Sequence, residues 1–193
     1  MVRPGRDRLE GVVEVDEAYV GGPRSGKRGR GAEGKALVLI AAQVNGKRIG
    51  RVRLRRIADA SGASLDAAVR EAVEPGSVIR TDGWVGYNNL ENLGYAREII
   101  RKDAEVGENL LAFCNTVVSL LKRWLLGTHQ GAVSHEHLDY YLDEFTFRYN
   151  RRTSRYRGKL FYRLLQQAVA TDPVPYSELV RHAQTAGSGQ HHI

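Results

Sequence analysis

The sequence predicts an α/β fold in which a mixed β-sheet carries helices on its faces. A continuous apolar run, ALVLIAAQVN (36–45), is typical of a strand that is buried on both sides. The Asn45-Gly46 pair then marks a tight turn, and RIGRVRLRRI (48–57) alternates basic and apolar residues as a half-solvated strand does. Helical patterns begin only after these strands, so the chain opens with a sheet and closes with helices.

The remaining elements support the same class. GVVEVDEAYV (11–20) predicts a first strand, and the Gly-, Lys- and Arg-rich segment 21–35 predicts a loop that leads into the second strand. The later elements are a helix over 60–76 with a Ser61 or Ser64 cap, a strand over 77–82, a turn with a short helix over 83–95, a strand over 96–102, and helices over 108–127, 134–150 (with a serine cap) and 159–169. Three antiparallel strands followed by a helical crossover to a further strand is the order of the ribonuclease-H-like fold.

Composition limits the class of protein. The 193 residues are enough for one domain, which we expect over 11–170, with a disordered N-terminus over 1–10 and a loose tail over 171–193. The 29 basic and 22 acidic residues give a net charge of +7, which favours a polyanion such as nucleic acid as partner.

The single cysteine and the hydropathy of the sequence exclude several classes of protein. A single cysteine, Cys114, excludes an intrachain disulfide and a cysteine-rich zinc ribbon within this sequence, and its place on an apolar helix face predicts a buried thiol. Neither a signal-peptide core nor an apolar run of about 20 residues is present, so we expect a cytoplasmic protein without a membrane partner.

Two acidic residues stand at the ends of predicted strands. Asp16 lies in VEVDEAYVGG and Asp82 lies in VIRTDGWVGY. A carboxylate in such a place is costly unless it is paired or binds a cation, and Mg²⁺ prefers oxygen ligands. Two ions about 4 Å apart are the arrangement that many phosphoryl-transfer sites use. The alternative is structural, with Asp16 capping a turn and Asp82 opening the TDG turn.

A predicted helix adds two polar residues to this pattern. Asn115 and Lys122 are seven positions apart, about two helical turns, so they share one face. The Asn115 amide can offer its oxygen to a metal or its NH₂ to a phosphate, and Lys122 can hold a phosphate as a point charge. The alternative for both residues is an ordinary polar stripe on an amphipathic helix.

Four strings carry a resemblance to a known family: VEVDEAYVGG, TDGWVGY, SLLKRWLLGTHQG and HLDYYLDEFTFRYNRR. They resemble the catalytic domain of bacterial insertion-sequence transposases of the ISXO type, in the DDE superfamily, over residues 11–169. The resemblance implies a ribonuclease-H-like fold, Mg²⁺ or Mn²⁺, cleavage at transposon ends and strand transfer into target DNA.

The resemblance also implies roles for individual residues. Asp16 corresponds to the first metal ligand and Asp82 to the second. Asn115 falls at the third position, where many DDE enzymes have glutamate and the ISXO type is described with a D-D-N-K pattern. Lys122 matches the basic residue that contacts DNA near the cleaved end.

Two further residues are secondary candidates. His129 is a candidate for the neighbourhood of the site, with a loop histidine as the alternative, and Glu144 is the substitute ligand if Asn115 points away. Full members of the family usually carry an N-terminal zinc ribbon and a helix-turn-helix-like region. This chain begins close to the first catalytic strand, so we expect a truncated copy, a fragment or an alternative start.

An arginine cluster is the candidate DNA surface. Its members alternate with tyrosines that can stack on bases, and the alternative is a solvated helix end. The cluster comprises Arg148, Arg151, Arg152 and Arg155. Because transposition handles two DNA ends, we expect a homo-oligomer on DNA. Two other functions remain open, a catalytically inactive DNA-binding remnant and a generic ribonuclease-H-like nuclease.

Overall fold

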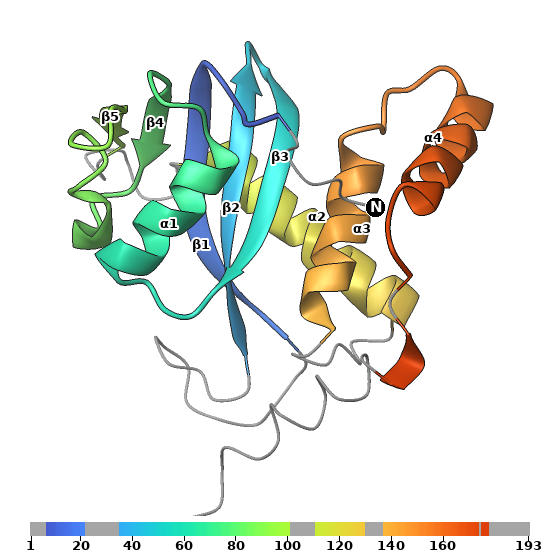
Figure 1. The fold of residues 1–193 in the computed structure, drawn as a ribbon. Coiled ribbons are helices and arrows are strands. Elements are labelled where there is room, and N and C mark those ends of the chain that lie inside the picture. Colours follow the sequence, from blue (N-terminus) through green and yellow to red (C-terminus); the bar gives the residue numbers. More distant parts are fainter. Residues whose placement is uncertain (1–6, 22–34, 101–110, 130–136, 174, 178–193) are drawn as a thin grey trace, which may run out of the picture.

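The computed structural model describes residues 7–21, 35–100, 111–129, 137–173 and 175–177 (Figure 1). Strands and helices follow one another nearly as predicted. They are β1 (Val12–Val20), β2 (Ala36–Asn45), β3 (Arg48–Ile57), α1 (Gly62–Ala72), β4 (Val78–Thr81), the 3₁₀ helix η1 (Val85–Tyr87), β5 (Ala96–Ile99), α2 (Ala112–His129), α3 (Leu138–Tyr149) and α4 (Arg157–Val169).

The strands form one mixed sheet in the order β3-β2-β1-β4-β5. The β1–β2 and β2–β3 pairs are antiparallel, whereas β1–β4 and β4–β5 are parallel. This order, with α1 as the crossover between β3 and β4, confirms the predicted ribonuclease-H-like fold.

Helices cover both faces of the sheet, which explains the apolar run of β2. Successive β2 residues point to opposite sides, so Leu39 joins the core beneath α1 and Ile40 joins the core beneath α2 and α3. In Figure 1, α1 lies in front of the sheet and α2 crosses behind it. Both cores are apolar and each contains fully buried residues of β1 or β2.

The N-terminal segment departs from the expected disorder over 1–10. Residues 1–6 lie outside the described residues, but Leu9 is fully buried and forms a parallel bridge with Val73 at the end of α1. The Leu9 N–H donates to Ala72 O at 2.8 Å, and the Glu74 N–H donates to Leu9 O at 2.8 Å. The ordered fold therefore begins before β1.

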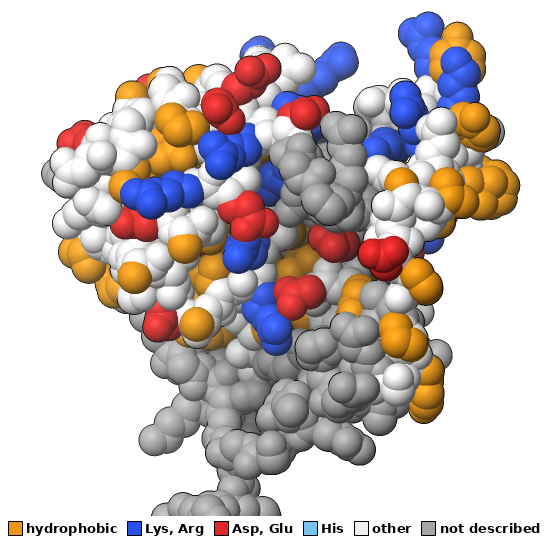
Figure 2. Space-filling model, viewed as in Figure 1, with side chains coloured by type: hydrophobic (Ala, Val, Ile, Leu, Met, Phe, Trp, Pro, Cys, Tyr) orange, Lys and Arg blue, Asp and Glu red, His pale blue; other side chains and the backbone are white. Residues whose placement is uncertain are grey.

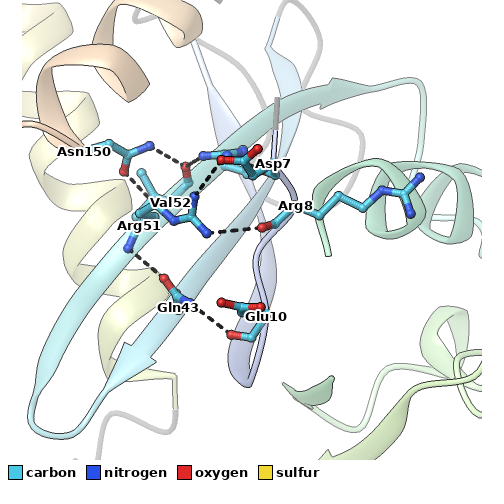
Figure 3. A network of polar contacts seen from close by, with 8 residues as sticks. Asp7, Arg8, Glu10, Gln43, Arg51, Val52 and Asn150 are labelled. Carbon is cyan, nitrogen blue, oxygen red and sulfur yellow. Dashed lines mark hydrogen bonds and ion pairs between the residues drawn. The ribbon is translucent and has the colours of Figure 1, made fainter. Parts of the chain in front are cut away.

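Polar groups close the free edge of the sheet at β3 (Figure 3). The Asn150 amide binds both backbone groups of Val52, accepting from its N–H at 2.7 Å and donating to its carbonyl at 3.0 Å. The Arg51 side chain donates to Arg8 O at 3.3 Å and links β3 to the N-terminal segment. An exposed strand edge is a template for pairing with another chain, and the Asn150 amide occupies this edge at Val52.

The positions at which the helices begin agree only in part with the predicted capping residues. Ser61 caps α1 as predicted, because its hydroxyl accepts from the Ser64 N–H at 3.4 Å. The serine expected to cap α3 lies outside the described residues, and α3 begins at Leu138. Helix α4 packs against the end of α3, where Phe147, Leu160 and Leu164 help to line a cavity of about 300 Å³. No helix in the described ranges is long and apolar enough to cross a membrane.

Candidate active site

The two predicted aspartates lie on adjacent parallel strands, Asp82 just after the end of β4 and Asp16 in the middle of β1, so the expectation that Asp16 ends its strand was wrong. Strands β1 and β4 pair with Glu14 opposite Arg80, and Asp16 and Asp82 each follow two residues later. Parallel strands lie about 4.8 Å apart, and side chains return to the same face every second residue. This register brings the two carboxylates together at one edge of the sheet, on the face that α2 covers.

The electrostatics of Asp16 agree with this proximity. Burial is the largest cause that raises the pKa of Asp16, and the charges of Glu17, Asp82 and Glu14 raise it further. A hydrogen bond from the Glu17 N–H acts in the opposite direction, and the resulting pKa is about 7. At neutral pH the metal-free side chain is therefore about half protonated, because its environment opposes a second negative charge.

Each aspartate uses one carboxylate oxygen locally. Asp16 Oδ1 accepts from the Glu17 N–H at 2.9 Å, within strand β1. Asp82 Oδ1 accepts from the Trp84 N–H at 2.9 Å, so Asp82 does open the TDG turn as the structural alternative predicts. Among the residues that the structure describes, no lysine or arginine forms an ion pair with either carboxylate. A divalent cation is the compensation that suits two such neighbouring carboxylates.

Arg97 on β5 holds the loop that carries Asp82. Its guanidinium donates to Thr81 Oγ1 at 3.2 Å, to Asn88 Oδ1 at 2.8 Å and to Trp84 O at 3.1 Å. A further, longer hydrogen bond of 3.4 Å reaches the Asp82 carbonyl oxygen. The sequence analysis missed Arg97, because a lone arginine in a short strand carries no local signal of these contacts.

Glu14 joins β1 to the helix that carries Asn115. Its Oε2 accepts from the Phe113 N–H at 2.9 Å and from the Cys114 N–H at 3.2 Å, at the start of α2. The Glu14 residue is only 7% exposed. The sequence analysis missed this role, although a glutamate on the same strand face as Asp16 was a visible signal.

Cys114 shows that the first turn of α2 covers β1 near Asp16. Its Sγ lies 3.6 Å from the carbonyl oxygen of Ile40, and Ile40 pairs with Asp16 across the β1–β2 ladder. Burial raises the pKa of the Cys114 thiol well above its usual value, and the charges of Asp16 and Glu14 raise it further. The thiol is fully buried, as predicted. Asn115 is the next residue along this turn.

Asn115 and Lys122 both lie on the exposed side of α2. The opposite side of the helix is buried through Cys114, Val117, Leu121 and Leu125. Seven residues correspond to about 10 Å along a helix axis, so Lys122 stands two turns beyond Asn115. Lys122 is therefore accessible to a molecule that extends past the carboxylates along α2.

The two secondary candidates do not belong to this site. His129 ends α2, about 21 Å along the axis from Asn115, and packs against Trp124 and Tyr141 with ring centroids 4.9 and 4.4 Å away. Glu144 lies on α3, which packs on the edge strand β3, and its carboxylate pairs with Arg148 at 2.7 Å. The expectations for His129 as a neighbour and Glu144 as a substitute ligand were therefore wrong.

The arginine cluster lies at the end of α3 and along the β3 edge. Arg148 pairs with Glu144, and the Arg151 guanidinium lies 3.9 Å from the centroid of the Phe147 ring. Arg152 lies 4.1 Å over the Tyr149 ring and donates to the carbonyl oxygens of Gly50, at 3.3 Å, and Ile49. Arg155 is exposed. These contacts give Arg152 in particular a structural role, and contact of the cluster with DNA remains a prediction.

The basic residues of β3 are also largely compensated. Arg56 pairs with Asp139 at 3.1 Å, and Arg55 pairs with Glu71 on α1. Figure 2 shows basic and acidic side chains interspersed on this face of the molecule. The net positive charge of the chain therefore does not produce a continuous basic surface in this view.

The donor set that remains for a metal is small. Within the described part of the chain, no group of three or more His, Cys, Asp or Glu side chains is arranged to hold an ion. The candidate protein ligands of an ion are the carboxylates of Asp16 and Asp82 and, as a third oxygen donor, the Asn115 amide. Mg²⁺ commonly accepts one or two carboxylates when water and substrate phosphate complete its coordination, so the residues present fit such an ion.

The sequence matches a known protein family over the part of the chain that contains the candidate active site. The family model described as the ISXO2-like transposase domain matches residues 8–150, a range that contains all four residues of the D-D-N-K pattern. No curated protein matches the chain.

One similar solved structure is the cryo-EM structure of the simian T-cell lymphotropic virus intasome in complex with PP2A regulatory subunit B56 gamma. It is 12% identical with a TM-score of 0.49, and the match covers 73% of this chain and 48% of that chain, less than half of its length. The fold assignment rests on the strand order, and the family assignment rests on the match to well over half of the sequence. The chain belongs to the ISXO2-like transposase domain family.

Proposed function

We propose that the chain is the catalytic domain of an insertion-sequence transposase that cleaves DNA at the ends of its element and joins them to target DNA. Family membership makes this a transposase-type, DNA-processing protein. The observation that carries the finer proposal is the carboxylate pair, since Asp16 in β1 and Asp82 after β4 lie side by side without a cationic side chain of the described chain as partner.

In this proposal, Asp16 and Asp82 hold Mg²⁺ or Mn²⁺, and Asn115 completes the protein ligands from α2. When bound, such ions polarise a phosphodiester and activate a hydroxyl nucleophile. Arg97 holds the Asp82 loop in place, and the burial of Asp16 opposes a bare negative charge there, which a bound cation would offset. Lys122 holds a DNA phosphate two helical turns away as a point charge.

The proposed chemistry consists of two exchanges at phosphorus. Water attacks the phosphodiester at the end of the element, the P–O3′ bond breaks, and a free 3′-hydroxyl and a 5′-phosphate result. That 3′-hydroxyl then attacks a target phosphodiester and displaces the target 3′-oxygen, so each step breaks one P–O bond and forms another. Because two ends must be processed together, the proposal includes a homo-oligomer assembled on DNA.

Nicking of labelled DNA in Mg²⁺ or Mn²⁺ tests the proposed function. Wild-type protein should nick, whereas Asp16→Ala and Asp82→Ala should lose at least about a hundredfold in rate, as expected for loss of electrostatic stabilisation of the reaction. Asp139→Ala is the matched control, since it removes a half-exposed carboxylate on α3 that pairs with Arg56.

The alternatives give different results in the same assay. Wild-type protein that binds DNA but does not cleave it in Mn²⁺ would contradict the proposal and favour an inactive remnant. Cleavage of an RNA–DNA hybrid without any strand-transfer product would favour a generic ribonuclease-H-like nuclease.

A further inference from the structure

We infer that Glu14 is a positioning residue that fixes the first turn of α2 on β1 and thereby sets Asn115 beside Asp16. The inference rests on the proposed function, because it assigns Asn115 a place in the metal site. The observation that supports it does not depend on any metal. One carboxylate oxygen of Glu14 accepts hydrogen bonds from two backbone N–H groups of α2, those of Phe113 at 2.9 Å and Cys114 at 3.2 Å.

These two N–H groups belong to the part of a helix that lacks internal partners. The first four N–H groups of an α-helix have no carbonyl one turn earlier to accept them. Helix α2 begins at Ala112, so Phe113 and Cys114 are its second and third residues. Their cap comes from a strand residue 99 and 100 positions earlier in the sequence rather than from the preceding residue. A capping contact within the helix would not fix its position on the sheet, whereas this one does.

Asn115 is the residue immediately after the capped pair. Its N–H donates to Leu111 O at 2.9 Å, in the regular helical pattern. The cap therefore holds the same turn that presents the Asn115 side chain. Glu14 is in turn linked to Asp16 through the backbone of β1, since the two residues lie two positions apart on the same face of that strand.

The electrostatics strengthen this contact. The Glu14 residue is 7% exposed, and no lysine or arginine of the described chain forms an ion pair with it. The aligned peptide dipoles at a helix N-terminus favour negative charge, and hydrogen bonds to a carboxylate are stronger than those between neutral groups. The buried carboxylate and the helix end therefore stabilise each other.

The metal site is held from two directions. Arg97 fixes the Asp82 loop from β5, and Glu14 fixes the Asn115 turn from β1. Asp16 lies between them on a strand that is paired on both sides. Loss of the Glu14 cap should let α2 shift relative to Asp16 without disturbing the aspartate pair.

Two substitutions at Glu14, each with two readouts, test the inference. Glu14→Ala removes both accepted hydrogen bonds, while Glu14→Gln keeps an oxygen acceptor of the same reach without the charge. Val69→Ala is the matched control, because it removes buried methyl groups from the core beneath α1, on the opposite face of the sheet from α2. Amide hydrogen exchange at Phe113 and Cys114 reports the cap, and Mn²⁺ titration by electron paramagnetic resonance reports the metal site.

We expect Glu14→Ala to lose more amide protection and more Mn²⁺ affinity than Glu14→Gln. Glu14→Ala should exchange faster at Phe113 and Cys114 and should bind Mn²⁺ about tenfold more weakly, the scale seen when residues that orient metal ligands are removed. Glu14→Gln should keep most of the protection and stay within about threefold of wild-type affinity. Val69→Ala should lower the melting temperature with Mn²⁺ affinity unchanged.

Three outcomes would overturn the inference. The first is unchanged exchange at both amides in Glu14→Ala, and the second is Mn²⁺ affinity in that variant equal to that of Val69→Ala. The third is a Glu14→Gln variant that keeps its amide protection yet loses as much affinity as Glu14→Ala, which would make the Glu14 charge itself the important feature. Wild-type protein that binds no Mn²⁺ would refute the proposed function instead, and the exchange data would still decide whether the cap exists.

Discussion

Replacing Asp16 by asparagine is expected to stabilise the metal-free protein above neutral pH. The folded environment raises the pKa of Asp16 from its ordinary value of 3.8 to about 7, chiefly through burial. Asparagine has nearly the same shape, carries no charge, and keeps an oxygen to accept the Glu17 N–H that now binds Oδ1 at 2.9 Å. The substitution therefore removes a buried charge and retains the local hydrogen bond.

The magnitude follows from the pKa difference. A difference between 3.8 and about 7 corresponds to roughly 4 kcal/mol at 1.36 kcal/mol per unit. Between these pH values the folded state holds a proton that the unfolded state has lost, so the free energy of unfolding falls as pH rises and the penalty is complete above pH 7. For a chain of this size, 1 kcal/mol shifts the melting temperature by about 2–4 °C.

The assay is urea or thermal unfolding of wild-type and Asp16→Asn protein in a chelator at pH 8 and at pH 5. The variant should be the more stable by several kcal/mol at pH 8, and the advantage should shrink by more than half at pH 5. Added Mg²⁺ should stabilise only the wild-type protein, because a ligand of the folded state shifts the unfolding equilibrium. An Asp16→Asn protein that is no more stable than wild type at pH 8, or whose advantage is the same at both pH values, would contradict this prediction.

Three further substitutions test other contacts. Tyr87→Phe removes the hydroxyl that donates to Glu17 at 2.7 Å and should cost about 1–3 kcal/mol in urea unfolding, and an unchanged midpoint would contradict this. Asn150→Ala leaves the Val52 N–H unpaired and its carbonyl with only the Arg53 guanidinium, and should cost about 1–3 kcal/mol and promote aggregation; an unchanged unfolding midpoint would contradict this. Arg97→Lys keeps the charge but not the planar fork, and should slow DNA cleavage about tenfold or more; a wild-type rate would show that the loop does not need it.

The sheet was predictable because its signals are local. The buried strand over 36–45, the Asn45-Gly46 turn and the half-solvated strand over 48–57 each follow from residue types within a few positions. Asp16 and Asp82 were visible for the same reason, since an acid beside apolar strand residues stands out, although Asp16 lies in the middle of β1 rather than at its end. Their alignment by the parallel register of β1 and β4 required only the predicted fold.

The supporting residues were not predictable, because their partners lie far away in the sequence. Glu14 binds N–H groups about a hundred positions later, and Arg97 contacts side chains and carbonyls on a loop that begins 16 positions earlier. The buried Leu9 was missed for a related reason: one apolar residue in a polar segment has no periodicity, and its burial depends on α1.

The partners of the arginine cluster were likewise not predictable. Charged side chains at a helix end look available to a ligand when only their neighbours in sequence are known. In the folded chain Arg152 donates to carbonyl groups of β3, residues 102 and 103 positions earlier, and Arg148 pairs one turn back with Glu144. Sequence reasoning identified the charge but had no access to these long-range partners.

The proposed function depends most directly on a divalent-metal site formed by Asp16 and Asp82. Mn²⁺ titration monitored by electron paramagnetic resonance tests it without DNA and without turnover. Wild-type protein and the control Asp139→Asn should bind Mn²⁺ alike, whereas Asp82→Asn, confirmed as folded by circular dichroism, should lose most of the affinity. Equal binding by Asp82→Asn and wild-type protein would contradict the account.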